Sequence, residues 1–86
     1  MTLFLLSEVM AKRGISHRQS RSDPNFATIC ELVDGRSVPV VMVNLVDGSF
    51  LEMPHYEEME VKAKIKLAEA QAEYHRRFKA WYKKSH

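Results

Sequence analysis

The stretch that decides the fold contains the tetrapeptide LVDG twice: residues 31–49 read ELVDGRSVPVVMVNLVDGS. Both copies lie between apolar runs of β-forming residues. An Asp-Gly pair between two such runs is typical of a hairpin, because glycine adopts a positive φ without steric cost. The two turns predict a three-stranded antiparallel meander with strands at about 27–33, 36–46 and 49–53.

The lengths of these two turns decide which way each side chain of the meander points. Two-residue turns would give a middle strand whose two ends face the same neighbour, which requires a β-bulge. Three-residue Val-Asp-Gly loops remove that conflict, and we favour them. The alternative is a bulge near Pro39, which has no N–H to donate to a neighbouring strand.

The favoured register predicts a sheet with two apolar faces, both of which require a cover. One face carries Cys30, Leu32, Val38, Val40, Met42 and Phe50. The other face carries Ile29, Pro39, Val41, Val43, Leu45, Leu51 and Met53. A single helix covers only one face, so the second face is a candidate interface.

The segment before the meander predicts a short helix followed by a loop. Residues 7–14 read SEVMAKRG, in which Gly14 is a natural left-handed residue after the helix and Ile15 a contact of its last turn. The pattern leaves open whether residues 2–6 join this helix or form a strand, and we favour the helix. Residues 16–25 are polar and without period, which predicts a flexible basic loop.

The C-terminal third predicts one long helix from about Pro54 to Ser85, because proline is favoured at the first helical position and no glycine or proline follows. Its apolar residues form two stripes. The first consists of Val61, Ile65, Ala68 and Ala72, and we expect it to cover the meander. The second consists of Leu67, Ala70, Tyr74, Phe78 and Trp81. We expect this second stripe to pack on the N-terminal helix or on a second copy of the chain.

The chain of 86 residues predicts a single small α+β domain over residues 1–86: a short N-terminal helix, a three-stranded antiparallel β-meander and a long C-terminal helix. A core of this size is close to the lower limit for an unaided fold, which favours a homodimer. Cys30 is the one cysteine, which excludes an internal disulfide and favours a cytoplasmic location. The apolar run at residues 3–6 is far shorter than the roughly 20 residues that span a bilayer, so we expect no membrane association.

The sequence offers little for catalysis. Its four histidines show no metal-binding spacing, and its three glycines lie in turn or cap contexts rather than in a phosphate-binding loop. No serine has a recognisable base nearby in the sequence. We therefore predict a protein that is not an enzyme and that uses no cofactor, no metal and no small-molecule substrate.

Charge is strongly segregated along the chain, although the formal net charge is only +2. Residues 12–21 hold four basic side chains and no acidic one, and residues 75–86 hold five basic ones and no acidic one. Residues 22–60 hold eight acidic side chains against Arg36. Such a distribution bears on partners rather than on fold.

The basic aromatic helix end, residues 74–86, is the strongest functional signal. Lysine and arginine neutralise phosphates, exposed aromatic rings stack on bases, and the same residue types are enriched at protein interfaces. The predicted contact residues are Arg18, Arg21, Arg76, Arg77, Lys79, Trp81, Tyr82, Lys83 and Lys84. We predict a small regulatory or accessory protein whose basic ends contact nucleic acid, a nucleic-acid-handling complex or an acidic protein surface. The alternative is a protein-binding inhibitor or adaptor of the kind that phages and plasmids encode.

Overall fold

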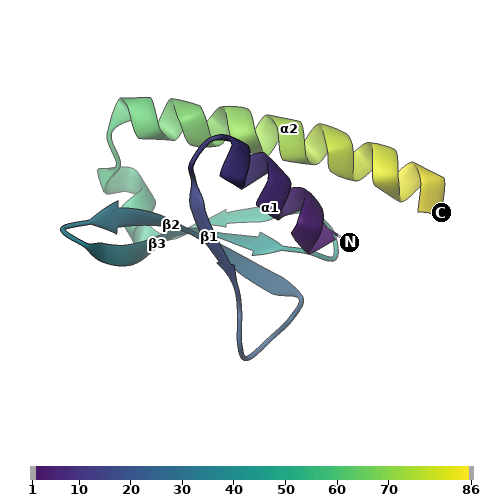
Figure 1. The fold of residues 1–86 in the computed structure, drawn as a ribbon, viewed down its shortest axis with the longest axis horizontal. Coiled ribbons are helices and arrows are strands. Elements are labelled where there is room, and N and C mark those ends of the chain that lie inside the picture. Colours follow the sequence, from purple (N-terminus) through teal and green to yellow (C-terminus); the bar gives the residue numbers. More distant parts are fainter. Residues whose placement is uncertain (1, 86) are drawn as a thin grey trace.

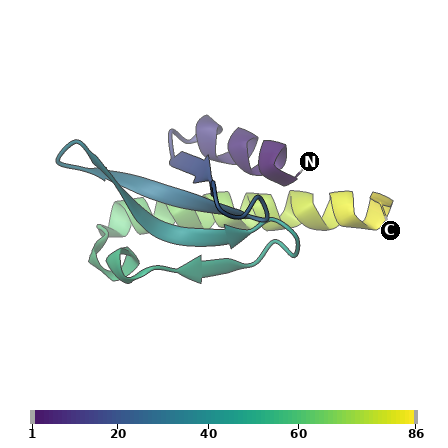
Figure 2. The same ribbon diagram turned by 90° about the horizontal axis from the view of Figure 1, so that it is seen from below.

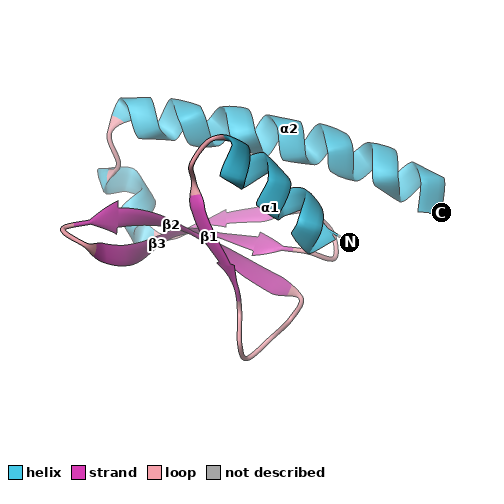
Figure 3. Ribbon diagram, in the orientation of Figure 1, coloured by secondary structure: helices cyan, strands magenta, loops and turns pink. Residues whose placement is uncertain are grey.

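The structure is a computed structural model that describes the backbone of residues 2–85 and the side chains of residues 3–84. It has an α+β fold, as the sequence predicts. Its elements are the helix α1 (Thr2–Lys12), the strands β1 (Ser16–Gln19), β2 (Phe26–Val33), β3 (Arg36–Asn44) and β4 (Phe50–Glu52), the 3-10 helix η1 (Pro54–Glu58) and the helix α2 (Val61–Ser85). The strands form one antiparallel sheet in the order β1-β2-β3-β4, with α1 and α2 on the same side of it (Figures 1 and 3).

The strand β1 extends the predicted three-stranded meander to four strands, and the prediction of a loop over all of residues 16–25 is wrong for its first part. Residues 16–19 pair with residues 27–30 of β2. The side chains of residues 16–19 are polar and show no apolar period, so their pattern does not indicate a strand. This strand lies at the edge of the sheet, where the backbone groups of β2 offer it hydrogen bonds. The ring of His17 also contacts the hydroxyl of Ser7 at 2.9 Å, which links β1 to α1.

The first LVDG turn has two residues rather than the favoured three. Asp34 and Gly35 have φ values of 50° and 78°, which is the conformation of a tight two-residue hairpin turn. The bulge that such a turn requires lies beside Pro39: Ile29 pairs with Val41 and Cys30 pairs with Pro39, which leaves Val40 as the extra residue. The alternative with a bulge near Pro39 is therefore confirmed, and three-residue loops are wrong.

The second LVDG turn has four residues, 45–48, between Asn44 and Ser49. Gly48 has a φ of 76°, as its place at the end of the turn predicts. The longer loop pairs Phe50 with Val43, and cross-strand partners share a face. The predicted faces are therefore wrong for several residues. Val38, Val40 and Phe50 lie with Ile29 toward the helices, and Pro39 and Leu51 lie with Cys30 on the other face.

The helix α1 includes residues 2–6, as we favoured. It ends as predicted at Gly14, which has a φ of 67°. The N–H of Ile15 donates to the carbonyl oxygen of Met10 at 2.9 Å, and the N–H of Gly14 donates to that of Ala11 at 3.0 Å. These two bonds form a Schellman motif, which turns the chain from the helix into β1.

The core lies between the sheet and both helices, and the second apolar stripe of α2 supplies it. From α2 it contains Leu67, Ala70, Tyr74 and Phe78, from α1 Leu6, Val9 and Met10, from the sheet Ala27, Ile29, Val40, Val41 and Val43, and from the β3–β4 loop Leu45. Trp81 is partly buried against this cluster. The large side chains of the second stripe bury more apolar area than the two alanines of the first could.

The first stripe of α2, which we expected to cover the meander, is exposed along its whole length. The helix also starts later than predicted, because Pro54 opens the separate 3-10 helix η1 and α2 begins at Val61. Both helices cover one face of the sheet. Seen from below in Figure 2, the other face carries no helix, and Met42 and Leu51 pair across it.

Candidate nucleic-acid interface

The structure divides the predicted contact residues at the end of α2 between two sides of the helix. Three line a groove between α2 and the β3–β4 loop: Lys79, Tyr82 and Lys83. Three others line a hollow between α2 and α1: Arg77, Trp81 and Lys84. Arg76 is exposed, and His86, the last residue of the predicted basic aromatic end, lies outside the described residues. The end of α2 therefore presents two surfaces rather than one.

Arg18 and Arg21 lie on a third surface, formed by the β1–β2 hairpin. They line a hollow with Gln19, Ser20 and Thr28. Figure 1 shows the loop of this hairpin projecting away from α2, on the opposite side of the sheet. Arg18 and Arg21 thus do not share one continuous binding surface with the basic residues at the end of α2.

The groove beside the β3–β4 loop, which we call the loop groove, has a volume of about 750 Å³, within the range of natural small-ligand pockets. Its lining consists of Val46, Asp47, Gly48, Ser49, His75, Phe78, Lys79, Tyr82 and Lys83. One wall is therefore the loop and the other is the last three turns of α2.

Side-chain hydrogen bonds hold the loop in one shape. The side-chain oxygen of Asn44 accepts the N–H of Val46 at 2.9 Å, and the carboxylate of Asp47 accepts the N–H of Ser49 at 2.8 Å. The hydrogen bond from Ser49 holds the pKa of Asp47 below its ordinary value, so this carboxylate is ionised at neutral pH. The loop wall is preorganised and carries one negative charge.

Gly48 seats the loop on α2. A Cβ at this position would lie 3.2 Å from two carbons of the Phe78 ring, so only glycine allows this approach and the positive φ together. The Nε2–H of His75 donates to the carbonyl oxygen of Gly48 at 2.8 Å, and its ring meets Phe50 edge-on at 5.0 Å. Two neighbouring turns of α2 therefore fix the loop that faces them.

Tyr82 gives the loop groove an accessible aromatic surface. Its ring lies 6.2 Å from that of Phe78 at an interplanar angle of 21°, which is a stacked arrangement. Phe78 is buried in the core, whereas Tyr82 is 48% exposed. The buried ring supports the exposed one, so Tyr82 offers a flat surface at little further cost in side-chain entropy.

The lysines of the loop groove lie on either side of Tyr82 in the sequence. Lys79 and Lys83 are one helical turn apart, so their ammonium groups project from the same side of α2. Among the described residues neither forms an ion pair with an acidic side chain. With Asp47 opposite, the groove combines two positive charges and one negative charge around an aromatic ring.

The opposite side of α2 is organised by ion pairs with α1. Arg77 contacts Glu8 at 2.6 Å and Glu73 at 3.5 Å, and Arg13 contacts Glu73 at 2.8 Å. The hydrogen bond from Arg13 holds the pKa of Glu73 below its ordinary value, and Glu8 raises the pKa of Arg77. The charge of Arg77 is matched within the fold, so its predicted role as a contact residue would require breaking these pairs.

Trp81 lies in the hollow on this side together with Phe4, which is 78% exposed. The centroid of the Trp81 ring lies 5.7 Å from that of the Phe78 ring. The hollow has a volume of about 410 Å³, and Leu5 and Ala80 complete its apolar lining. Trp81 therefore both completes the core and forms part of an apolar surface between the two helices.

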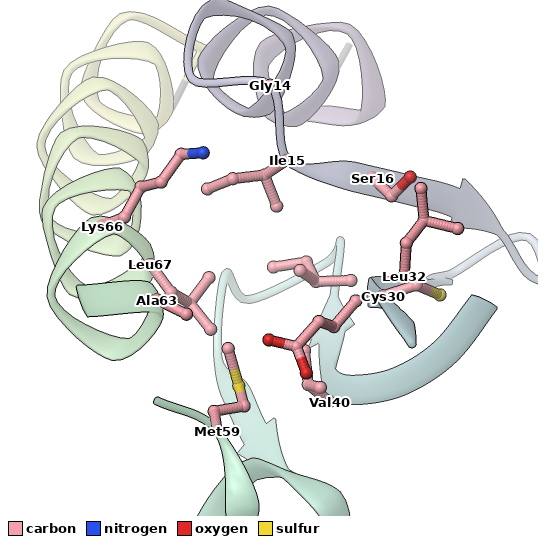
Figure 4. A pocket seen from close by; sticks show the side chains of 12 residues that line it. Gly14, Ile15, Ser16, Cys30, Leu32, Val40, Met59, Ala63, Lys66 and Leu67 are labelled. Carbon is pink, nitrogen blue, oxygen red and sulfur yellow. The ribbon is translucent and has the colours of Figure 1, made fainter. Parts of the chain in front are cut away.

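A smaller pocket of about 190 Å³ opens between α2 and the sheet at the other end of the helix. Figure 4 shows Ile15, Met59 and Leu67 pointing into it from three different segments. Cys30 and Lys66 are among its further lining residues. The pocket is mainly apolar and far smaller than the loop groove, which makes it a gap in the packing rather than a site for chemistry.

Other kinds of site find no support in the part of the chain that the structure describes. Residues 2–85 contain no cluster of three histidine, cysteine or acidic side chains that could hold a metal ion. No helix in that range is long and apolar enough to cross a membrane. Comparisons with protein families, with characterised proteins and with solved structures find no match to this chain.

Sequence reasoning missed the loop wall of the groove and the role of His75. Val46, Asp47 and Ser49 belong to the second LVDG turn, which we read only as a turn. His75 lies three residues before Phe78 and seven before Tyr82, on the same side of the helix, and this spacing could have placed it in the groove.

Proposed function

We propose that this protein is a non-catalytic binding protein that holds single-stranded nucleic acid in the loop groove. The observation that carries the proposal is the exposed ring of Tyr82, stacked on the buried Phe78 and accompanied by Lys79 and Lys83. Aromatic platforms combined with basic side chains are the usual means of binding single strands, since every base has a flat face that stacks. A regulatory or accessory role in the cytoplasm is part of the same proposal.

In this proposal each group in the groove has one task. A base of the strand stacks on Tyr82, and the ammonium groups of Lys79 and Lys83 contact the flanking phosphates. A duplex keeps its bases stacked on each other, so the groove favours a single strand. Stacking and phosphate contacts carry little base specificity, and we expect little sequence preference.

The test is the binding of fluorescently labelled single-stranded oligonucleotides, measured by anisotropy over a range of salt concentrations. Lys79→Gln with Lys83→Gln should weaken binding and lower the slope of log affinity against log salt by about 1.4, roughly 0.7 for each lost phosphate contact. The matched control is Arg36→Gln with Lys66→Gln, which removes the same charge from exposed positions outside the groove. Equal losses in the two double variants would show a diffuse charge effect and would reject the groove.

The role of Tyr82 is tested separately. Tyr82→Ala should weaken binding and leave the salt slope unchanged, because a stacking contact releases no counterions. Tyr82→Phe should retain binding, since the flat ring remains. If Tyr82→Ala binds as tightly as the wild type, the aromatic platform has no part in recognition.

A second candidate function rests on the hollow between the two helices. The exposed Phe4 and the partly buried Trp81 form an apolar surface there, beside the charged pair of Glu8 and Arg77. Aromatic residues flanked by charges are typical of protein-binding hot spots, which fits an inhibitor or adaptor. Under this reading Phe4→Ser abolishes capture of a partner protein and leaves oligonucleotide binding unchanged.

A further inference from the structure

The outer face of α2 carries an apolar stripe that nothing in the described chain covers. Val61 is 71% exposed and Ile65 is 54% exposed, and Ala68 and Ala72 continue the stripe at spacings of three and four. These four residues, the outer stripe, cover three turns of one helix face, or about 17 Å at 1.5 Å per residue. The spacing is that of the seam between two paired helices.

We propose that two copies of the chain associate through their outer stripes, with the two α2 helices packed antiparallel. Ala68 and Ala72 are small enough to let a second helix approach at the close end of the usual 8–10 Å axial separation. In this arrangement Val61 lies near Ala72 of the other copy, and Ile65 lies near Ala68. The homodimer expected from the sequence is thereby moved to a different surface, because the second stripe is already used in the core.

The charges that flank the outer stripe complement themselves in an antiparallel pair. Lys62 and Glu69 lie on the same flank of the stripe, one near each end, and within the described chain neither forms an ion pair. A two-fold axis between the helices places Lys62 of each copy beside Glu69 of the other. The same contact therefore occurs twice, as a symmetric interface requires.

The direction of pairing follows from the distribution of charge along α2. Arg76 continues the outer face beyond the stripe and is exposed, so a parallel pair would bring this cation against its own copy. An antiparallel pair instead places Arg76 toward the partner's acidic segment Glu57, Glu58 and Glu60. Like charges across an interface are disfavoured and opposite charges favoured, which selects the antiparallel arrangement.

The pairing has a consequence for the loop grooves, although it does not depend on their function. An antiparallel dimer centred between residues 65 and 68 places the two copies of Tyr82 roughly 45 Å apart along the helices, at 1.5 Å per residue. The grooves then lie at opposite ends of the dimer. The small contact area predicts reversible association, since stable interfaces bury about 800 Å² on each partner.

Sedimentation velocity of the protein without nucleic acid, over a wide concentration range, tests the pairing. The mass should rise from that of the 10.0 kDa monomer toward twice that value. Ile65→Asp should keep the protein monomeric at every concentration with an unchanged circular dichroism spectrum. The control is Leu51→Asp, which places the same charge at another exposed apolar residue and should leave association intact. A wild type that stays monomeric, or a dimer lost with Leu51→Asp and kept with Ile65→Asp, overturns the proposal.

Two further variants test the direction. Lys62→Glu alone should weaken association, and Lys62→Glu combined with Glu69→Lys should restore it. Val61→Cys mixed with Ala72→Cys should form a disulfide-linked dimer, and Val61→Cys alone should not; the wild type controls for Cys30, which is buried. Efficient cross-linking of Val61→Cys to itself would show a parallel pair and contradict the proposed geometry.

Discussion

Replacing Gly48 by alanine should destabilise the fold far more than the same change at Gly35. The two glycines have nearly equal φ values, 76° and 78°, so the backbone strain of a β-carbon is the same at both. They differ in what that carbon meets. At Gly48 it lies 3.2 Å from the ring of Phe78, whereas at Gly35 nothing lies within 4 Å.

The loss of folding free energy in these variants comes from two separate contributions. A left-handed conformation costs an alanine about 1–2 kcal/mol relative to glycine, and the loss of freedom in the unfolded chain offsets about 0.4–1 kcal/mol of that at both positions. Forcing an extra carbon into a packed site costs about 1–3 kcal/mol more, and this applies only at Gly48. The difference between the two variants should therefore be about 1–3 kcal/mol, or a further fall of at least about 4 °C in Tm for a domain of this size.

Urea denaturation followed by circular dichroism measures both free energies of unfolding. A double-mutant cycle with Phe78→Leu assigns the difference to the ring: in that background Gly48→Ala should cost no more than Gly35→Ala. If Gly48→Ala and Gly35→Ala are equally destabilising, the loop does not lie against Phe78 as described. The loop groove would then lack one of its walls.

Three further predictions concern the groove, the ion pairs and the core. Asp47→Asn should strengthen binding of a single-stranded oligonucleotide in the anisotropy assay, because it removes the negative charge opposite Lys79; weaker binding would mean that the carboxylate contacts the strand. Because the pKa of Glu73 is lowered in the folded state, its ion pairs stabilise the protein above the ordinary glutamate pKa of about 4.3 and are lost as the pH falls below it. The Tm of the wild type should therefore fall more steeply between about pH 5 and pH 3 than that of Glu73→Gln, and parallel curves would contradict this. Leu6→Ala, at a fully buried position, should cost about 2–5 kcal/mol in urea denaturation, whereas Leu32→Ala, at an exposed one, should cost less than about 0.5 kcal/mol; equal costs would contradict the described core.

The elements with strong local signals are the ones that the sequence predicts well. The Schellman ending at Gly14 and the positive φ values of Gly35 and Gly48 each depend on residues adjacent in the chain. The same holds for the order of helix, meander and helix. The 3-10 helix at Pro54 is an exception, because proline is equally suited to the first turn of either kind of helix.

Features that depend on distant contacts are the ones that sequence reasoning missed. The polar strand β1 forms because the edge of β2 offers it hydrogen bonds, which no pattern within residues 16–19 reveals. The alternation of hydrogen bonds along the middle strand allowed either three-residue turns or a bulge near Pro39. We favoured the three-residue turns, which was wrong. That choice placed Phe50 on the wrong face, although it packs edge-on against Tyr74 at 5.6 Å.

In the candidate site, too, the features with local signals were predictable and those that depend on distant contacts were not. Composition alone indicates that the end of α2 is basic and aromatic, and the positions of Lys79, Tyr82 and Lys83 on one side follow from helical spacing. Their separation from Arg77 and Trp81 depends on where α1 and the β3–β4 loop pack. The exposure of the outer stripe was missed as well: both stripes of α2 are apolar, and the greater apolar area of the second stripe was not used to decide which one is buried.

The central claim is that the loop groove, and no other surface of the protein, holds a single strand. Titrating the ¹⁵N-labelled protein with a short thymidine oligonucleotide and following its backbone amide signals by NMR tests this claim directly. Binding in the loop groove should give progressive shifts at residues 46–49 and on the groove side of residues 75–83, and should leave residues 18–21 and 61–68 unaffected. Shifts confined to the β1–β2 hairpin or to the hollow beside Phe4, or no shifts at low salt, would contradict it.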